Sequence, residues 1–101
     1  MSYIKLHRRL KRWEWYQSSE TVHVFIHLLL SANYKPKKWK GIEIKRGELI
    51  TGRHKLSEAT GISEMKIRSC LKHLQLTNEI TRKTTKHYTH LTVCNYEKYQ
   101  G

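Results

Sequence analysis

Acidic residues are scarce in this sequence. Eight Asp and Glu stand against twenty Lys and Arg, and no pair of carboxylates lies in a framework typical of a general acid and base. A glycine-rich phosphate loop is missing, as is the Gly-x-Ser-x-Gly pattern that surrounds a nucleophilic serine. We therefore expect that the chain is not an enzyme.

Cysteine is scarcer still. Cys70 and Cys94 are far apart and neither belongs to a Cys-x-x-Cys pair, so we expect buried free thiols. The seven histidines include His23 and His27 at i, i+4 spacing. No acidic or thiol side chain stands at a spacing that would complete a site of three or four ligands. We expect surface or packing histidines, no metal and no cofactor.

Long hydrophobic runs are also missing. The run from Val22 to Leu30 is interrupted by two histidines and is far shorter than the roughly 20 residues that span a bilayer. Residues 1–11 are basic, but no apolar stretch with a small-residue cleavage site follows them, as a secretory signal requires. We expect no membrane segment and a cytoplasmic location.

What the sequence does have is positive charge on a chain able to fold. Apolar residues make up 38% and proline occurs once, which suits one folded domain over residues 1–101 better than a disordered basic tail. A formal net charge of +12 opposes compaction and typically indicates a polyanionic partner. Nucleic acid is the first expectation, and solubility alone is the competing explanation.

The surest predicted element is a helix at residues 20–33, with Ser18 or Ser19 as its N-cap. Its apolar residues extend well around the cylinder, so the helix should be covered on more than one side. The cover is either the aromatic segment 13–16 or a second subunit. Residues 1–17 are expected to form an arm that packs on the core.

The rest of the chain alternates short strands and helices. Residues 34–40 read as a polar break around Pro36, and Gly61 should end a helix that Thr51 or Gly52 caps. The predicted elements are strands at 41–44 and 48–51, helices at 53–60 and 64–76, and a hairpin of residues 79–84 and 88–96 with its tip at 85–87. This order predicts an α+β winged helix-turn-helix with a three-helix core and a C-terminal β-hairpin wing.

Helical spacing divides the predicted helix at 64–76 into two faces. Ile67, Cys70, Leu71 and Leu74 form the inward stripe. The outward residues carry cations and hydroxyls that are able to reach phosphates and base edges. With the hairpin tip and the openings of both helices, the predicted DNA-binding residues are Arg53, Lys55, Ser63, Met65, Lys66, Arg68, Ser69, Lys72, His73, Arg82, Lys83, Lys86 and His87. The alternative is a solvated basic face on an ordinary three-helix core.

Aromatic residues interleaved with cations leave a further alternative open, which is stacking on single-stranded bases. Trp13, Trp15 and Tyr16 are expected to pack on the central helix instead. Trp39, within Lys37-Lys38-Trp39-Lys40, is the aromatic expected to be exposed to nucleic acid.

Several segments together resemble the N-terminal winged-helix region of phage and prophage replication proteins of the DnaD-like replisome-organizer type. They are Trp13–Tyr16, Phe25–Asn33, Lys45–Thr51, Thr60–Ser63, Ile67–Arg68, Leu71–Leu74 and Thr92–Gln100. The resemblance implies DNA binding in phage replication initiation, in a bacterial or phage-infected cell. With the outward face and the basic hairpin tip, we expect the partner to be double-stranded DNA. The resemblance also implies self-association, for which the arm and residues 20–33 are the expected homodimer surface, and contacts with replisome proteins.

Such proteins usually carry a helical C-terminal domain that lies outside these 101 residues. A role as a stand-alone regulator of transcription therefore remains open beside replication. In the same family the winged helix also serves oligomerisation, so a protein-interaction module with little DNA affinity is the competing function.

Overall fold

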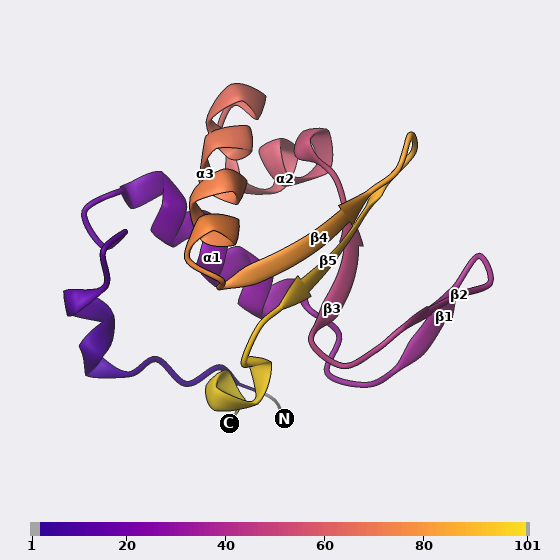
Figure 1. Cartoon of the computed structure of the whole chain (residues 1–101), viewed down its shortest axis with the longest axis horizontal. Coiled ribbons are helices and arrows are strands. Elements are labelled where there is room, and N and C mark those ends of the chain that lie inside the picture. The colour runs from indigo at the N-terminus through magenta and orange to yellow at the C-terminus, as the bar shows by residue number, and fades with distance from the viewer. Residues whose placement is uncertain (1–2, 101) are drawn as a thin grey trace.

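A computed structural model describes residues 3–100 as an α+β structure with three α-helices and two small antiparallel sheets. The elements follow one another as η1 (Arg8–Arg12, a 3-10 helix), α1 (Ser19–Ser31), β1 (Lys37–Trp39), β2 (Ile42–Ile44), β3 (Glu48–Thr51), α2 (Arg53–Thr60), α3 (Glu64–Leu76), β4 (Ile80–Thr84), β5 (Thr89–Val93) and η2 (Tyr96–Tyr99, a 3-10 helix). The first and last described segments lie side by side below the helices of Figure 1, where Ile4 and Gln100 form an isolated antiparallel bridge.

Local capping chemistry sets the helix boundaries. Ser18 caps α1 by accepting the backbone N–H of Thr21, and Ser63 caps α3 by accepting that of Lys66. Gly61 ends α2 in the left-handed conformation, with a φ of 76°, which glycine adopts without steric cost. The predicted caps Ser18 and Ser63 and the predicted stop Gly61 are confirmed.

The three-stranded sheet has the order β3-β5-β4, so the last strand of the chain lies in the middle. β4 and β5 form the predicted hairpin, which extends away from the helices at the upper right of Figure 1. Residues 34–40 were predicted as a break without structure, which is wrong for Lys37–Trp39. These residues form β1 and pair with β2 in a second hairpin.

One apolar cluster joins the helices to the three-stranded sheet. α1 packs against α3 and α2, and α3 packs against α2 and β4. Phe25 and Leu28 of α1, Leu74 of α3 and Leu91 of β5 are all at most 2% exposed. The inward stripe predicted for α3 is buried as expected, since Ile67, Cys70, Leu71 and Leu74 all belong to this cluster.

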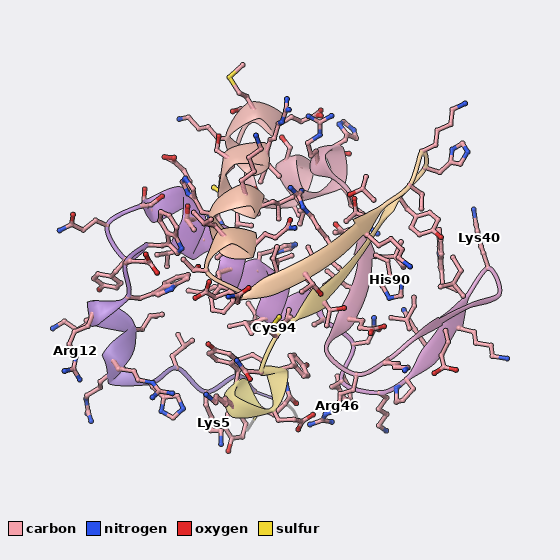
Figure 2. All side chains as sticks on the ribbon, in the orientation of Figure 1. Lys5, Arg12, Lys40, Arg46, His90 and Cys94 are labelled. Atoms are coloured by element: carbon pink, nitrogen blue, oxygen red, sulfur yellow. The ribbon has the colours of Figure 1, made fainter. Side chains whose placement is uncertain are left out.

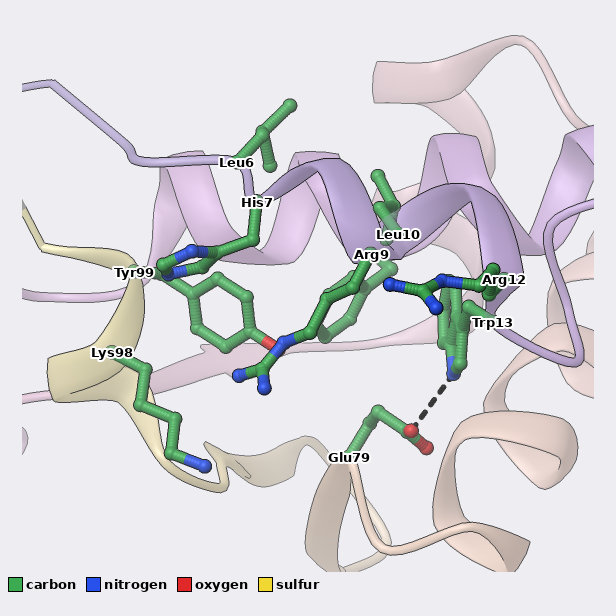
Figure 3. Close-up of a pocket in the computed structure, with 10 residues that line it drawn as sticks. Leu6, His7, Arg9, Leu10, Arg12, Trp13, Glu79, Lys98 and Tyr99 are labelled. Atoms are coloured by element: carbon green, nitrogen blue, oxygen red, sulfur yellow. Dashed lines mark hydrogen bonds between the residues drawn. The ribbon is translucent and has the colours of Figure 1, made fainter.

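The N-terminal arm, residues 3–17, covers one side of α1. The Trp13 ring lies 5.1 Å from the Phe25 ring, and its Nε1 donates a hydrogen bond to Glu79 Oε1 over 2.9 Å (Figure 3). At the start of the arm, the Lys5 backbone N–H donates to the Tyr99 carbonyl over 2.8 Å. The cover of this part of α1 is therefore the chain's own arm.

Two predicted ends differ from the structure because side chains redirect the backbone. α1 ends at Ser31 instead of Asn33, since the backbone N–H and the side-chain amide of Asn33 both donate to the Glu48 carbonyl. β5 ends at Val93 instead of Tyr96. Tyr96 is the first residue of η2, and its side chain packs tightly on Gly47. A Cβ at Gly47 would lie 2.9 Å from Tyr96 Cβ.

Of the two free thiols, Cys70 is buried as expected and Cys94 is only half-buried. Among the described residues, no helix combines the length and apolar character needed to cross a membrane.

Candidate nucleic-acid interface

The outward face of α3 presents exposed cations beside small polar groups. The buried stripe of the helix fixes its rotation, and the opposite side exposes Met65, Lys66, Arg68, Ser69 and Lys72. The Ser69 hydroxyl donates to the Met65 carbonyl over 3.4 Å, which keeps it close to the helix surface. These predicted residues share one face, as helical spacing requires.

His73 does not share that face. Its ring stacks nearly parallel on Trp15, with centroids 4.2 Å apart and an interplanar angle of 8°. Its Nδ1 lies 3.1 Å from the Thr21 hydroxyl. His73 is thus half-buried and connects α3 to the arm and to α1, instead of pointing outward as predicted.

Three arginines from three different elements influence one another electrostatically, and two of them, Arg53 and Arg82, line the same groove. Arg53 opens α2, Arg68 lies on α3, and Arg82 lies on β4. Burial lowers the pKa of Arg82, and the positive charges of Arg53 and Arg68 lower it further. Arg82 is half-buried and its Nε donates to the neutral Gln75 side chain over 2.8 Å. We call Arg53, Arg68 and Arg82 the arginine cluster.

The carboxylates of α2 and α3, Glu58 and Glu64, both contact His54. His54 Nε2 lies 2.8 Å from Glu58, and His54 Nδ1 lies 3.2 Å from Glu64. Within residues 3–100, Arg46 and Glu97 form the one ion pair between a Lys or Arg side chain and a carboxylate. The arginine cluster is therefore not neutralised by an ion pair within the described chain.

The β4–β5 tip, residues 85–88, is ordered by a threonine. Thr85 Oγ1 accepts the backbone N–H groups of His87 and Tyr88 and donates to the Tyr88 carbonyl over 3.1 Å. Lys86 and His87 at the tip are exposed, as is Lys83 near the end of β4. Their exposure agrees with the prediction that the tip is polar and basic.

A groove runs between the start of α2 and the β4–β5 hairpin. Predicted residues Arg53, Lys55, Arg82, Lys86 and His87 line it, together with Trp39, Tyr88 and Glu64. The structure thus brings together the predicted residues of α2 and the hairpin. Lys66, Ser69 and Lys72 stand on the exposed face of α3 outside this lining.

Two features of the site are not apparent in the sequence. Gln75, which holds Arg82, lies on α3 seven positions before it, and no motif marks the pair. Trp39 reaches the groove because its ring contacts that of Tyr88, with centroids 5.3 Å apart. That contact depends on β1, which was predicted as a break.

The histidines form no cluster suited to a metal ion. Within residues 3–100, no group of three or more His, Cys, Asp or Glu side chains lies close enough to hold one. His27 Nε2 lies 3.3 Å from the hydroxyl of Ser31 on the next turn. Burial and the neighbouring His23 both lower the pKa of His27.

Compared with known proteins, the chain matches no family model, no curated protein and no solved structure.

Proposed function

We propose that this protein is a winged helix-turn-helix that binds double-stranded DNA. The observation that carries the proposal is the arginine cluster, because Arg53 and Arg82 line one groove, Arg68 adds its positive charge, and none of the three forms an ion pair with a carboxylate within residues 3–100. Mutual repulsion of like charges is unfavourable in the isolated protein, and phosphate groups would relieve it.

In this proposal α2 and α3 form the helix-turn-helix and the β4–β5 hairpin is the wing. Lys66, Arg68, Ser69 and Lys72 on the exposed face of α3 would enter the major groove, where guanidinium and ammonium groups contact guanine edges. Lys83, Lys86 and His87 at the wing would lie along the backbone, with Arg53 and Lys55 at the start of α2. Backbone contacts position the protein and carry little sequence information.

The test is fluorescence anisotropy of a labelled random duplex of about 24 base pairs. If about six phosphates are neutralised, log K should fall with log salt at a slope near −5. Replacing Arg68 and Lys72 together by Ala should weaken binding by about 1 to 3 kcal/mol for each of the two side chains that reads a base. A salt slope near zero would contradict the proposal.

A matched control removes two cations elsewhere. Lys5 and Arg12 are exposed on the arm side, remote from the β4–β5 tip (Figure 2). Their double replacement by Ala changes net charge by the same amount and should alter duplex affinity by less than about threefold. Equal losses in both double variants would remove α3 from the interface.

Self-association is a second candidate function, and one side of α1 favours it. Leu30 is 66% exposed, and the half-buried Val22 and Ile26 precede it at intervals of four residues, so all three lie on one helix face. Light scattering after size-exclusion chromatography distinguishes a dimer from a monomer, and Leu30→Lys should shift a dimer to monomers. A dimer that ignores duplex and single strands at low salt would favour the interaction module over DNA binding.

The role of DNA binding is proposed to be replication initiation or transcriptional control, as the DnaD-like resemblance and the fold suggest. Selection of bound sequences from a random duplex pool separates the two. Enrichment of a palindrome would favour dimeric operator binding and regulation. Binding without enrichment would favour a replicative role.

A further inference from the structure

The β1–β2 hairpin is an additional element beside the helices and the three-stranded sheet. Each strand has three residues and pairs only with the other. A two-stranded hairpin of this length is not stable by itself in water. It is held in place by Ile44, which is 1% exposed, and by the edge-to-face contact of Trp39 with Tyr88 of the β4–β5 tip.

The turn of this hairpin places a lysine in an unfavourable backbone conformation. Lys40 has a φ of 48° and Gly41 a φ of 79°, which is the pattern of a type I′ turn. The first position of such a turn favours Asn, Asp or Gly, whereas a long side chain is strained there. A strained residue at an exposed tip suggests that its side chain has a function.

Lys40 and Lys37 are the two hairpin cations without an opposing carboxylate. Lys38 stands opposite Glu43 in the strand register, whereas Lys37 stands opposite Ile44. Lys40 Nζ lies 5.0 Å from the Trp39 ring centroid. Figure 2 shows Lys40 extending from the turn toward the side on which the β4–β5 tip lies.

The hairpin continues the basic surface of the candidate interface. Lys37 and Lys55 line a second groove, between β1 and α2, which adjoins the groove lined by Arg53 and Arg82. Trp39, Ile50, Thr51 and Lys55 line both grooves. Among the described residues that line the two grooves, Glu64 is the one with a carboxylate, and it contacts His54. A positive path therefore leads from α2 and the β4–β5 tip to the β1–β2 hairpin.

We propose that the β1–β2 hairpin is a second DNA-contacting arm, in which Lys37 and Lys40 bind backbone phosphates of the same duplex outside the segment contacted by α3. This inference rests on the proposed duplex binding. The longest dimension of the molecule is 40 Å, which corresponds to about twelve base pairs at about 3.4 Å each. Figure 1 shows the β1–β2 turn at the far end of this axis from the N-terminal arm, well to one side of α3.

The experiment compares a double variant, Lys37→Gln with Lys40→Asn, on duplexes of about 10 and 24 base pairs that share the same central sequence. On the long duplex the salt slope should fall by about two, and affinity near 0.1 M salt should fall on the order of tenfold. On the short duplex affinity should change by less than about twofold. The control is Lys38→Gln, whose charge already faces Glu43. It removes one charge, as does the single variant Lys37→Gln, and it should lose less affinity on the long duplex than Lys37→Gln does.

The choice of Asn at position 40 separates binding from folding. Asn tolerates a positive φ and forms the favoured Asn-Gly turn, so the single variant Lys40→Asn should raise the melting temperature. Lower affinity in a variant with a higher melting temperature supports a contact with DNA. Unchanged affinity of Lys40→Asn on the long duplex would overturn the proposed role of Lys40, whatever its melting temperature.

The remaining outcomes distinguish the arm from the interface as a whole. Unchanged affinity of the double variant on both duplexes, while the Arg68 and Lys72 double variant loses affinity, overturns the arm alone. Equal losses on both lengths place the hairpin within the α3 footprint and also overturn it. If the unaltered protein binds neither duplex, or binds only single strands, the proposed function fails before the arm is considered.

Discussion

The indole of Trp13 donates its N–H to the carboxylate of Glu79, linking two residues that are 66 positions apart. The same ring packs on Phe25 of α1. Trp13 thereby joins the arm to the central helix and to the residue just before β4. The arm is a part of the folded structure through this contact.

The first prediction concerns this hydrogen bond. Trp13→Phe keeps an aromatic ring against Phe25 and removes the donor to Glu79. We expect the free energy of unfolding to fall by about 1.5 kcal/mol, the lower end of the range for a hydrogen bond to a charged group. Urea unfolding followed by circular dichroism measures it. Trp13→Ala should cost about 3 kcal/mol because it also removes the ring that packs on Phe25. An unchanged free energy of unfolding in Trp13→Phe would assign no role to the bond.

Helices were predictable from the sequence because their signals are local. The N-caps Ser18 and Ser63 and the glycine stop at Gly61 act within one turn of the residues they terminate. The buried stripe of α3 follows from helical spacing alone. These local signals fixed α2 and α3 at the boundaries observed.

Contacts between distant segments were not predictable in the same way. Lys37–Trp39 has no alternating pattern and becomes a strand only by pairing with Ile42–Ile44. The side of α3 that His73 occupies depends on Trp15, which lies in a segment without regular repeats. The charge of the side chains was enough to predict which residues form the candidate site. Which of them lie side by side depends on the pairing of the strands, which the sequence does not show.

The second prediction separates packing from DNA contact at the end of α3. Lys72 is exposed, whereas the adjacent His73 stacks on Trp15. His73→Ala should lower the free energy of unfolding by about 1 to 2 kcal/mol and leave duplex affinity within about twofold. Lys72→Ala should leave the free energy of unfolding nearly unchanged and should lower the duplex affinity. Urea unfolding and anisotropy on the same samples test both, and a large affinity loss in folded His73→Ala would return His73 to the interface.

The third prediction concerns pH. Burial raises the pKa of Glu48, but hydrogen bonds from the Lys45 backbone N–H and from His90 outweigh it, and the net pKa lies below the ordinary value of 4.5. A lowered folded-state pKa contributes stability that is present above the unfolded value and is lost as pH falls through the folded value. Stability should therefore decrease as pH falls below about 4.5.

Glu48→Gln provides the control for this pH dependence. Gln keeps an acceptor near His90 and does not titrate, so its unfolding free energy should vary less between pH 6 and pH 3 than that of the unaltered protein. Urea unfolding at each pH measures the difference. Parallel curves for the two proteins would show that the acid transition belongs to other groups.

The fourth prediction concerns Gln75, the neutral partner of Arg82. Gln75→Glu would place a carboxylate within hydrogen-bond distance of the arginine cluster. The new ion pair should stabilise the fold by a few tenths of a kcal/mol, and the negative charge in the last turn of α3 should cost about as much. We therefore expect the free energy of unfolding to change by less than about 0.5 kcal/mol. Duplex affinity should fall on the order of tenfold near 0.1 M salt, because Arg82 would be neutralised and phosphates repelled.

The matched control makes the same chemical change on the arm. Gln17 is exposed between η1 and α1, and Gln17→Glu alters net charge identically. Because salt screens charges beyond about 10 Å, its effect on duplex affinity should stay below about twofold. A loss confined to Gln75→Glu, without a change in stability, would tie DNA binding to the unbalanced charge of the arginine cluster. Equal affinities in the two variants would show that net charge alone attracts DNA and that the cluster has no special part in binding.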